Sequence, residues 1–145
     1  MKSRSAASCR SDCPVATALD ILGDRWTLLI VRDMLMKNHR EYGAFKASEE
    51  KPASNILADR LRKLEAHGVV RKVPHATDAR KSEYYLTDKG LDLAPVLMDL
   101  VLWSAQHEVT SVSPEVVRRM KEDRDGFLQA LLKTARDNRD RRNNS

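Results

Sequence analysis

The stretch SNILADRLRKLEAHG at residues 54–68 decides the fold, together with the segment that follows it directly. This stretch predicts a helix from Asn55 to about His67. Ser54 is placed to cap the start of the helix, because a serine hydroxyl can accept a hydrogen bond from a free backbone N–H group. Gly68 is placed to end the helix in the left-handed conformation. Both boundaries of this helix are therefore marked in the sequence.

The next segment predicts a small antiparallel hairpin. VVRKV at 69–73 and SEYYL at 82–86 are short runs rich in β-branched and aromatic residues, which favour strands. The residues between them, PHATDARK, contain a proline and an aspartate and end in Arg80 and Lys81, a composition typical of an exposed turn. We therefore expect a two-stranded wing with a basic tip.

The predicted helix has two different faces. Leu57, Leu61 and Leu64 recur at helical periodicity and should face the core, so the residues between them point outward. A helix with a polar, basic outer face fits the major groove of duplex DNA, and a basic hairpin tip can reach a phosphate or the adjacent minor groove. The DNA-binding residues expected on these grounds are Ser54, Asn55, Ile56, Asp59, Arg60, Arg62, Lys63, Arg80 and Lys81.

The residues before this helix predict three further helices. Cys13 and Pro14 look like a helix start, RWTLLIVRDMLM at 25–36 reads as a largely buried helix, and EYGAFKAS at 41–48 as a short one. The element order predicts a mainly α-helical protein with a small β-hairpin wing, which is a winged helix-turn-helix domain. We expect this domain to span residues 14–107, preceded by a flexible N-terminal arm over residues 1–13.

The residues after the hairpin predict long helices. Thr87 can cap a helix from Asp88 to about His107 that is apolar almost all round, which suggests burial in a dimer. Pro95 leaves open whether this is one helix or two. A C-terminal helical extension is expected over residues 108–135, with Ser113 as the cap of its helix, and a disordered basic tail over residues 136–145.

The charge distribution agrees with an anionic partner. The chain of 145 residues carries a formal net charge of +5. Residues 37–89 contain 12 Lys or Arg against 8 Asp or Glu, whereas residues 90–132 contain 4 against 7. The basic excess thus lies in the expected DNA-binding segment and in both tails. No stretch approaches the roughly 20 apolar residues that span a bilayer, and the N-terminus lacks the apolar run of a signal peptide, so a cytoplasmic protein without a membrane partner is expected.

Three motifs together resemble one known family. They are CPV-x-x-ALDILGDRWTLLIVRDML from residue 13, NILADRLRKLEAHGVVRK from residue 55 and DARKSEYYLTDKG from residue 78. Over about residues 13–107 the chain resembles the HxlR-type regulators, a branch related to the MarR-type regulators. The resemblance implies a cytoplasmic homodimer, held by the N-terminal and long C-terminal helices, that represses or activates nearby genes by binding double-stranded DNA at a palindromic operator. It also implies that Ser54, Asn55 and Arg60 lie at the DNA-facing start and flank of the recognition helix, and Arg80 in the wing.

Cys13 is the candidate sensor residue. A thiol at a helix N-terminus is favoured as the thiolate by the helix dipole, although Asp12 beside it opposes this. HxlR-type proteins that sense oxidants or electrophiles use a cysteine at the matching position, so the resemblance implies an oxidant or small-molecule effector. The alternative is that Cys13 only begins its helix. Cys9 in the arm could act as a resolving thiol.

Other kinds of site have little support in the sequence. Cys9 and Cys13 are spaced C-x3-C and the four histidines are scattered, so no metal and no cofactor are expected. No glycine-rich phosphate loop or nucleophile with an ordered base is recognisable, so we do not expect an enzyme. A protein-interaction or RNA-binding module on the same fold remains the alternative function. The lack of an aromatic stacking platform favours duplex DNA over single strands.

Overall fold

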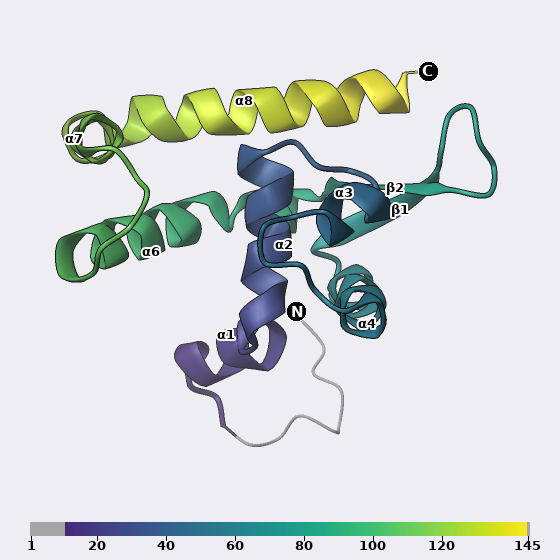
Figure 1. Ribbon diagram of the computed structural model, residues 1–145, viewed down its shortest axis with the longest axis horizontal. Helices are drawn as coiled ribbons and strands as arrows, with labels where there is room; N and C mark the ends of the chain where they lie inside the picture. Colours follow the sequence, from purple (N-terminus) through teal and green to yellow (C-terminus); the bar gives the residue numbers. More distant parts are fainter. Residues whose placement is uncertain (1–10, 145) are drawn as a thin grey trace.

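The computed structural model describes residues 11–144 (Figure 1). Cys9 and the rest of the first ten residues lie outside the described residues. In chain order the elements are α1 (Pro14–Leu22), α2 (Arg25–Met36), α3 (Tyr42–Lys46), α4 (Ser54–Ala66), β1 (Val70–Pro74), β2 (Ser82–Leu86), α5 (Asp88–Leu91), α6 (Ala94–His107), α7 (Pro114–Glu122) and α8 (Arg124–Asn143). This order confirms the winged helix-turn-helix fold predicted from the sequence.

The core lies where α2, α4, the hairpin and α6 meet. Val31 of α2, Leu57 and Leu64 of α4 and Met98 of α6 are almost completely buried, as is Phe45 of the short helix α3. The leucine face predicted for α4 is thus confirmed, and it presses the helix against α2 so that its other face points outward. α8 also packs against α2, and Figure 1 shows it crossing the upper end of that helix, above the other helices.

The wing consists of β1, β2 and the connecting residues 75–81. The strands pair antiparallel, with Val70 opposite Leu86 at one end and Pro74 opposite Ser82 at the other. Gly68 has φ +70°, the left-handed conformation predicted for the residue that carries the chain out of α4. Only three residues separate the end of α4 from the start of β1, so this end of the hairpin is fixed relative to α4.

The caps of the helices agree with the sequence in two cases and differ in one. The hydroxyl groups of Thr87 and Ser113 accept hydrogen bonds from Gly90 and Val116 N–H, as predicted for N-caps. The prediction for Ser54 was wrong: Ala53 is the N-cap of α4, and Ser54 is its first helical residue. The hydroxyl of Ser54 accepts a hydrogen bond from the ammonium of Lys46 instead of from an N–H group of its own helix.

The C-terminal half contains more helix than the sequence predicted. The stretch around Pro95 forms two helices, α5 and α6, with the proline in the first turn of α6, where its missing N–H group costs nothing. The expected disorder of residues 136–145 was wrong for residues 136–143, because α8 continues to Asn143. Side chains of this last part pair with groups on the wing and α5, which supplies the stabilisation that the apolar pattern lacks.

In the part of the chain that the structure describes, none of the helices combines the length and the apolar character needed to cross a bilayer.

Candidate nucleic-acid interface

The outer face of α4 is the first part of the candidate interface. Asn55, Asp59 and Arg62 follow one another at spacings of four and three residues, which places them on one stripe of the helix. Ser54, Asn55, Arg62 and Lys63 are exposed, while Ile56, Asp59 and Arg60 are partly buried. Lys63 and Arg62 approach the carboxylate of Asp59 at 3.3 and 3.5 Å. This face therefore presents an amide, a hydroxyl and two exposed cations to the solvent.

Arg60 lies differently from its neighbours. Its Nε atom is 3.0 Å from Oδ1 of Asp24, the N-cap residue of α2, and its guanidinium also pairs with Asp59. Partial burial alone would raise the pKa of the Asp24 carboxyl, but hydrogen bonds from Thr27 and Arg60 and from backbone N–H groups bring that pKa below its ordinary value. Only 23% of the Arg60 side chain is exposed, so it connects α4 to α2 at the flank of the outer face.

The start of α4 is held by the preceding helix α3. The Tyr42 hydroxyl donates a hydrogen bond to the carbonyl oxygen of Ser54 at 2.9 Å, and the Lys46 ammonium donates to the Ser54 hydroxyl. In the turn between α3 and α4, Glu50 forms a two-pronged ion pair with Arg32 of α2, with N–O distances of 2.8 and 2.9 Å. These contacts fix the end of α4 that would enter a DNA groove.

The wing supplies the second part of the interface. Arg80 has 91% of its side chain exposed, and its backbone N–H and Nε both approach Asp78 Oδ1, which shapes the tip. A hollow of about 440 Å³ lies between α3 and the wing, and its basic lining residues are Lys72, Arg80 and Lys81. Sequence reasoning missed Lys72, because alternation along β1 would put it on the same face as the buried Val70, whereas the structure leaves it exposed.

The loop end of the wing strands brings together three residues that are far apart in the sequence. His75 Nε2 lies 3.0 Å from Glu41 Oε1 and 3.7 Å from Glu83 Oε1. Backbone N–H groups of Thr77 and Asp78 donate to His75 Nδ1, so Nε2 carries the ring proton and donates to Glu41. A metal ion would need the Nε2 lone pair, so this arrangement favours a hydrogen-bond network. The scattered histidines of the sequence did not reveal it.

Cys13 is the N-cap residue of α1, as predicted. Its thiol is exposed and does not cap the helix by a side-chain hydrogen bond. Val15 and Leu19 on the same helix are also exposed, as are Leu100 and Trp103 on α6. Figure 1 shows α6 on the side of α2 opposite to α4 and the wing, and α1 at the lower end of α2. An apolar surface thus lies away from the DNA-binding elements.

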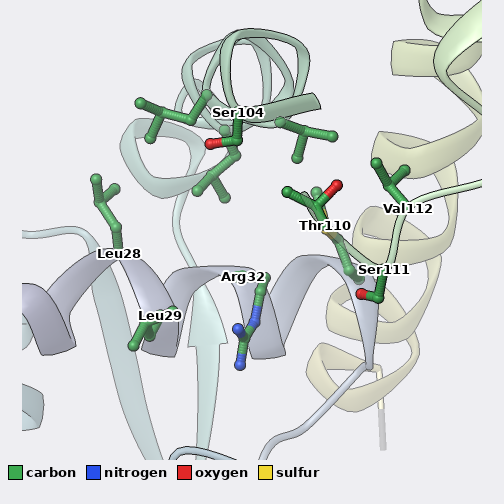
Figure 2. A pocket seen from close by; sticks show the side chains of 11 residues that line it. Leu28, Leu29, Arg32, Ser104, Thr110, Ser111 and Val112 are labelled. Atoms are coloured by element: carbon green, nitrogen blue, oxygen red, sulfur yellow. The ribbon is translucent and has the colours of Figure 1, made fainter. Parts of the chain in front are cut away.

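A groove of about 370 Å³ runs between α2, α6 and the loop after α6 (Figure 2). Leu28, Leu29 and Arg32 lie on one side, and Ser104 and residues 110–112 on the other. The guanidinium of Arg32 is already paired with Asp33 and Glu50. The groove therefore offers apolar surface and hydroxyl groups, which suits a small uncharged molecule.

The fold and the basic surface define a class: the protein is a winged helix-turn-helix DNA-binding regulator of transcription. Residues 21–112 match the HxlR-like helix-turn-helix family, and the chain belongs to that family. The chain is 36% identical to the HTH-type transcriptional regulator YvaP of Bacillus subtilis (strain 168), over 65% of this chain and 87% of the relative. It is 32% identical to the HTH-type transcriptional regulator Mb3122 of Mycobacterium bovis, over 72% of this chain and 65% of that protein.

Solved structures agree with this membership. The crystal structure of PA1607, described as a transcription factor, matches with a TM-score of 0.65 and 39% identity, over 74% of this chain and 73% of that chain. The reduced form of the transcriptional regulator YodB from B. subtilis matches with a TM-score of 0.55 and 28% identity, over 67% of this chain and 95% of that chain. The redox regulator HypR in its oxidized form matches with a TM-score of 0.59 and 25% identity, over 68% and 100%.

Proposed function

We propose that the chain is a non-enzymatic regulator that binds a palindromic operator as a symmetric homodimer. Each subunit inserts α4 into a major groove and places its wing on the adjacent backbone. The observation that carries this proposal is the combination of an exposed polar face on α4 with a hollow lined by Lys72, Arg80 and Lys81. The contact residues are those expected from the sequence, with Lys72 added. Arg60 must leave Asp24 to reach a base edge.

The exposed apolar residues on α1 and α6 support the dimer. In a monomer, Trp103 would remain 61% exposed and Leu19 57% exposed to water. Large apolar side chains left exposed on two helices are what a protein interface would cover. A twofold dimer uses the same patch on both subunits and so presents two equivalent copies of α4.

Two substitutions on the DNA face test the binding mode by different readouts. Arg60→Ala is expected to weaken binding to a selected operator by about 1–3 kcal/mol and to change the sequence preference, because arginine reads guanine by paired hydrogen bonds. Arg80→Ala is expected to lower the salt dependence of binding by about one unit in the log–log slope, because it removes one phosphate contact. Fluorescence anisotropy with labelled duplex measures both.

Arg118→Ala is the matched control, since Arg118 is an exposed arginine of α7 whose ion pair is with Glu122 of its own helix. Unfolding curves of each variant separate a loss of binding from a loss of fold. If neither Arg60→Ala nor Arg80→Ala differs from Arg118→Ala in duplex binding, the proposal that α4 and the wing bind DNA is wrong. Equal affinity for a single-stranded RNA or DNA probe would favour the alternative, a module without operator specificity.

We further propose that Cys13 makes the regulator responsive to oxidants or electrophiles. The thiol is exposed at the start of α1, beside the apolar residues proposed to form the dimer interface. A thiolate that adds to an electrophile, or that forms a disulfide, changes the size and contacts of this end of α1. The redox regulator HypR is similar to this chain in fold and sequence. The modification would act by moving α1 and changing the spacing of the two α4 helices.

A further inference from the structure

The C-terminal end of α8 lies against the hairpin where β1 ends and β2 begins. Arg142 Nε donates to Glu83 Oε2 at 3.2 Å, and its Nη2 donates to the carbonyl oxygen of Pro74 at 2.5 Å. Glu83 belongs to β2 and Pro74 to β1, so one guanidinium contacts both strands of the hairpin. Figure 1 shows the end of α8 above the point where the hairpin leaves the body of the protein.

Neighbouring residues of α8 add contacts to other elements. Arg139 forms an ion pair of 2.8 Å with Asp88 at the start of α5, and Asn138 donates to Asn38 before α3 at 3.0 Å. The side chain of Asn143 accepts a hydrogen bond from Arg71 of β1. The last two turns of α8 thus connect to the wing and to the segments that enter and leave it.

The helix that carries these contacts is itself anchored in the core. Its apolar residues pack against the buried cluster below α8, and these residues are Leu128, Leu131, Leu132 and Ala135. A two-stranded hairpin is only marginally stable by itself. Here the segment before α3 already adds a short bridge to β2, with Tyr84 N–H donating to the Arg40 carbonyl oxygen at 2.7 Å. Side-chain contacts from an anchored helix therefore restrict the directions in which the wing can point.

We propose that residues 138–143 hold the wing at a fixed angle to α4, and that Arg142 is the positioning residue. This inference rests on the proposed function, because a fixed wing matters only if its tip contacts DNA. The family match ends at residue 112, before α7 begins, so the helix involved lies outside the shared domain. HypR is matched over its whole length by 68% of this chain, so the rest of this chain has no counterpart there.

The test compares Arg142→Ala, Arg142→Lys and a chain ended after Asp137, each in the otherwise complete protein. The shortened chain keeps the four apolar residues that pack in the core, so it retains the anchored part of α8. Lys133→Ala is the control, because Lys133 is an exposed cation of α8 that pairs with Asp137 of the same helix. Two quantities are measured. One is the amide hydrogen exchange of residues 70–86 without DNA, and the other is the salt slope, which is the slope of log affinity for a selected duplex against log salt concentration.

In Arg142→Ala and in the shortened chain, amide exchange in the hairpin is expected to accelerate about ten-fold relative to Lys133→Ala. The salt slope is expected to fall by about one to two units, because the phosphate contacts of Arg80 and Lys81 become weaker. Adding Arg80→Ala to the shortened chain should then change the slope little. Arg142→Lys should be intermediate, because an ammonium lacks the planar fork that contacts both strands at once.

Unchanged hairpin exchange in both Arg142→Ala and the shortened chain would overturn the proposal. The proposal would also be overturned if Arg80→Ala alone lowers the salt slope of binding but Arg142→Ala and the shortened chain leave that slope unchanged. If Arg80→Ala in the complete chain leaves the slope unaltered, the wing contact of the proposed function is wrong. The exchange measurement still decides in that case whether α8 holds the wing.

Discussion

At the scale of single residues, the thiol of Cys13 is the group through which an oxidant would act. Treatment of the wild-type dimer with diamide or a quinone is expected to lower operator affinity about ten-fold or more, a coupling typical of two-state regulators. Cys13→Ser should keep its affinity under the same treatment. Operator release followed by anisotropy is the measurement.

Cys9→Ser serves as the matched cysteine variant. A response that survives in Cys9→Ser but not in Cys13→Ser identifies Cys13 as the reacting thiol. A disulfide between the two Cys13 residues requires their Cα atoms to approach within about 7 Å. If wild type and Cys13→Ser respond alike, or neither responds, Cys13 only begins its helix.

Glu50 is the residue whose titration should affect stability most clearly. Hydrogen bonds from Arg32 lower the pKa of its carboxyl from 4.5 to about 2. A lowered carboxyl pKa contributes stability that is present above the unfolded value and lost as the pH falls through the folded one. Glu50→Gln should therefore unfold with a free energy about 1–2 kcal/mol lower than wild type at neutral pH, the contribution of a charge-assisted pair.

The difference between wild type and Glu50→Gln should shrink as the pH falls from about 4.5 toward 2. Urea unfolding across this range, monitored by circular dichroism, measures it. Comparing the two proteins removes the titration of other carboxylates, such as Asp24, which both share. A difference that stays constant down to the lowest pH would show that the Arg32–Glu50 pair does not hold the turn before α4.

At the scale of elements, the turn from α4 into the wing was predictable because one residue determines it. Gly68 has φ +70° and a methyl group on it would meet no atom within 4 Å, so backbone strain alone opposes a side chain there. Gly68→Ala is expected to lower the free energy of unfolding by about 1 kcal/mol. Chemical denaturation of the purified variant gives this value.

Gly43→Ala is the paired control for this prediction. Gly43 also has open space around it, but it lies in helix α3 and its φ is not positive. The alanine there should be neutral or stabilising by up to about 1 kcal/mol. Equal effects of the two substitutions would mean that the left-handed conformation of Gly68 contributes nothing measurable.

Local patterns predicted the elements, whereas contacts across the sequence decided the details. The leucine spacing of α4 and the strand composition of the hairpin need only their own residues, and both predictions were confirmed. The role of Ser54 depends on Lys46, and the helical state of residues 136–143 depends on partners such as Asp88 and Glu83. No periodicity within a segment reports such partners, so these predictions were wrong.

The surface proposed to bind DNA was also predictable only in part. Helical spacing places Asn55, Arg62 and Lys63 on the outer side of α4, and the structure leaves them exposed. The same spacing could not show that Arg60 pairs with Asp24, which is 36 positions earlier in the numbering. Nor could it place Lys72 beside Arg80 and Lys81, because that requires the register of the hairpin.

At the scale of the whole molecule, one surface is proposed to bind DNA and another to bind the second subunit. α4 and the wing lie on one side of α2, α6 lies on the other, and α1 lies at the lower end of α2 in Figure 1; α1 and α6 carry the exposed apolar residues. Pairing through the apolar side would leave two copies of α4 free to face one duplex, about 34 Å apart, which is one turn of B-DNA. Light scattering at micromolar concentration should accordingly give the mass of two chains, and a monomer would contradict the symmetric dimer.

The spacing of the two half-sites tests directly whether a symmetric dimer reads both halves of one operator. A palindromic operator selected from genomic fragments is compared with versions that carry about five or ten extra base pairs between its half-sites, a half or a full turn of the duplex. A rigid dimer should bind the half-turn version about 100-fold or more weaker, because one α4 then faces the wrong side of the DNA. Affinity that does not change with spacing would contradict a dimer that reads both half-sites.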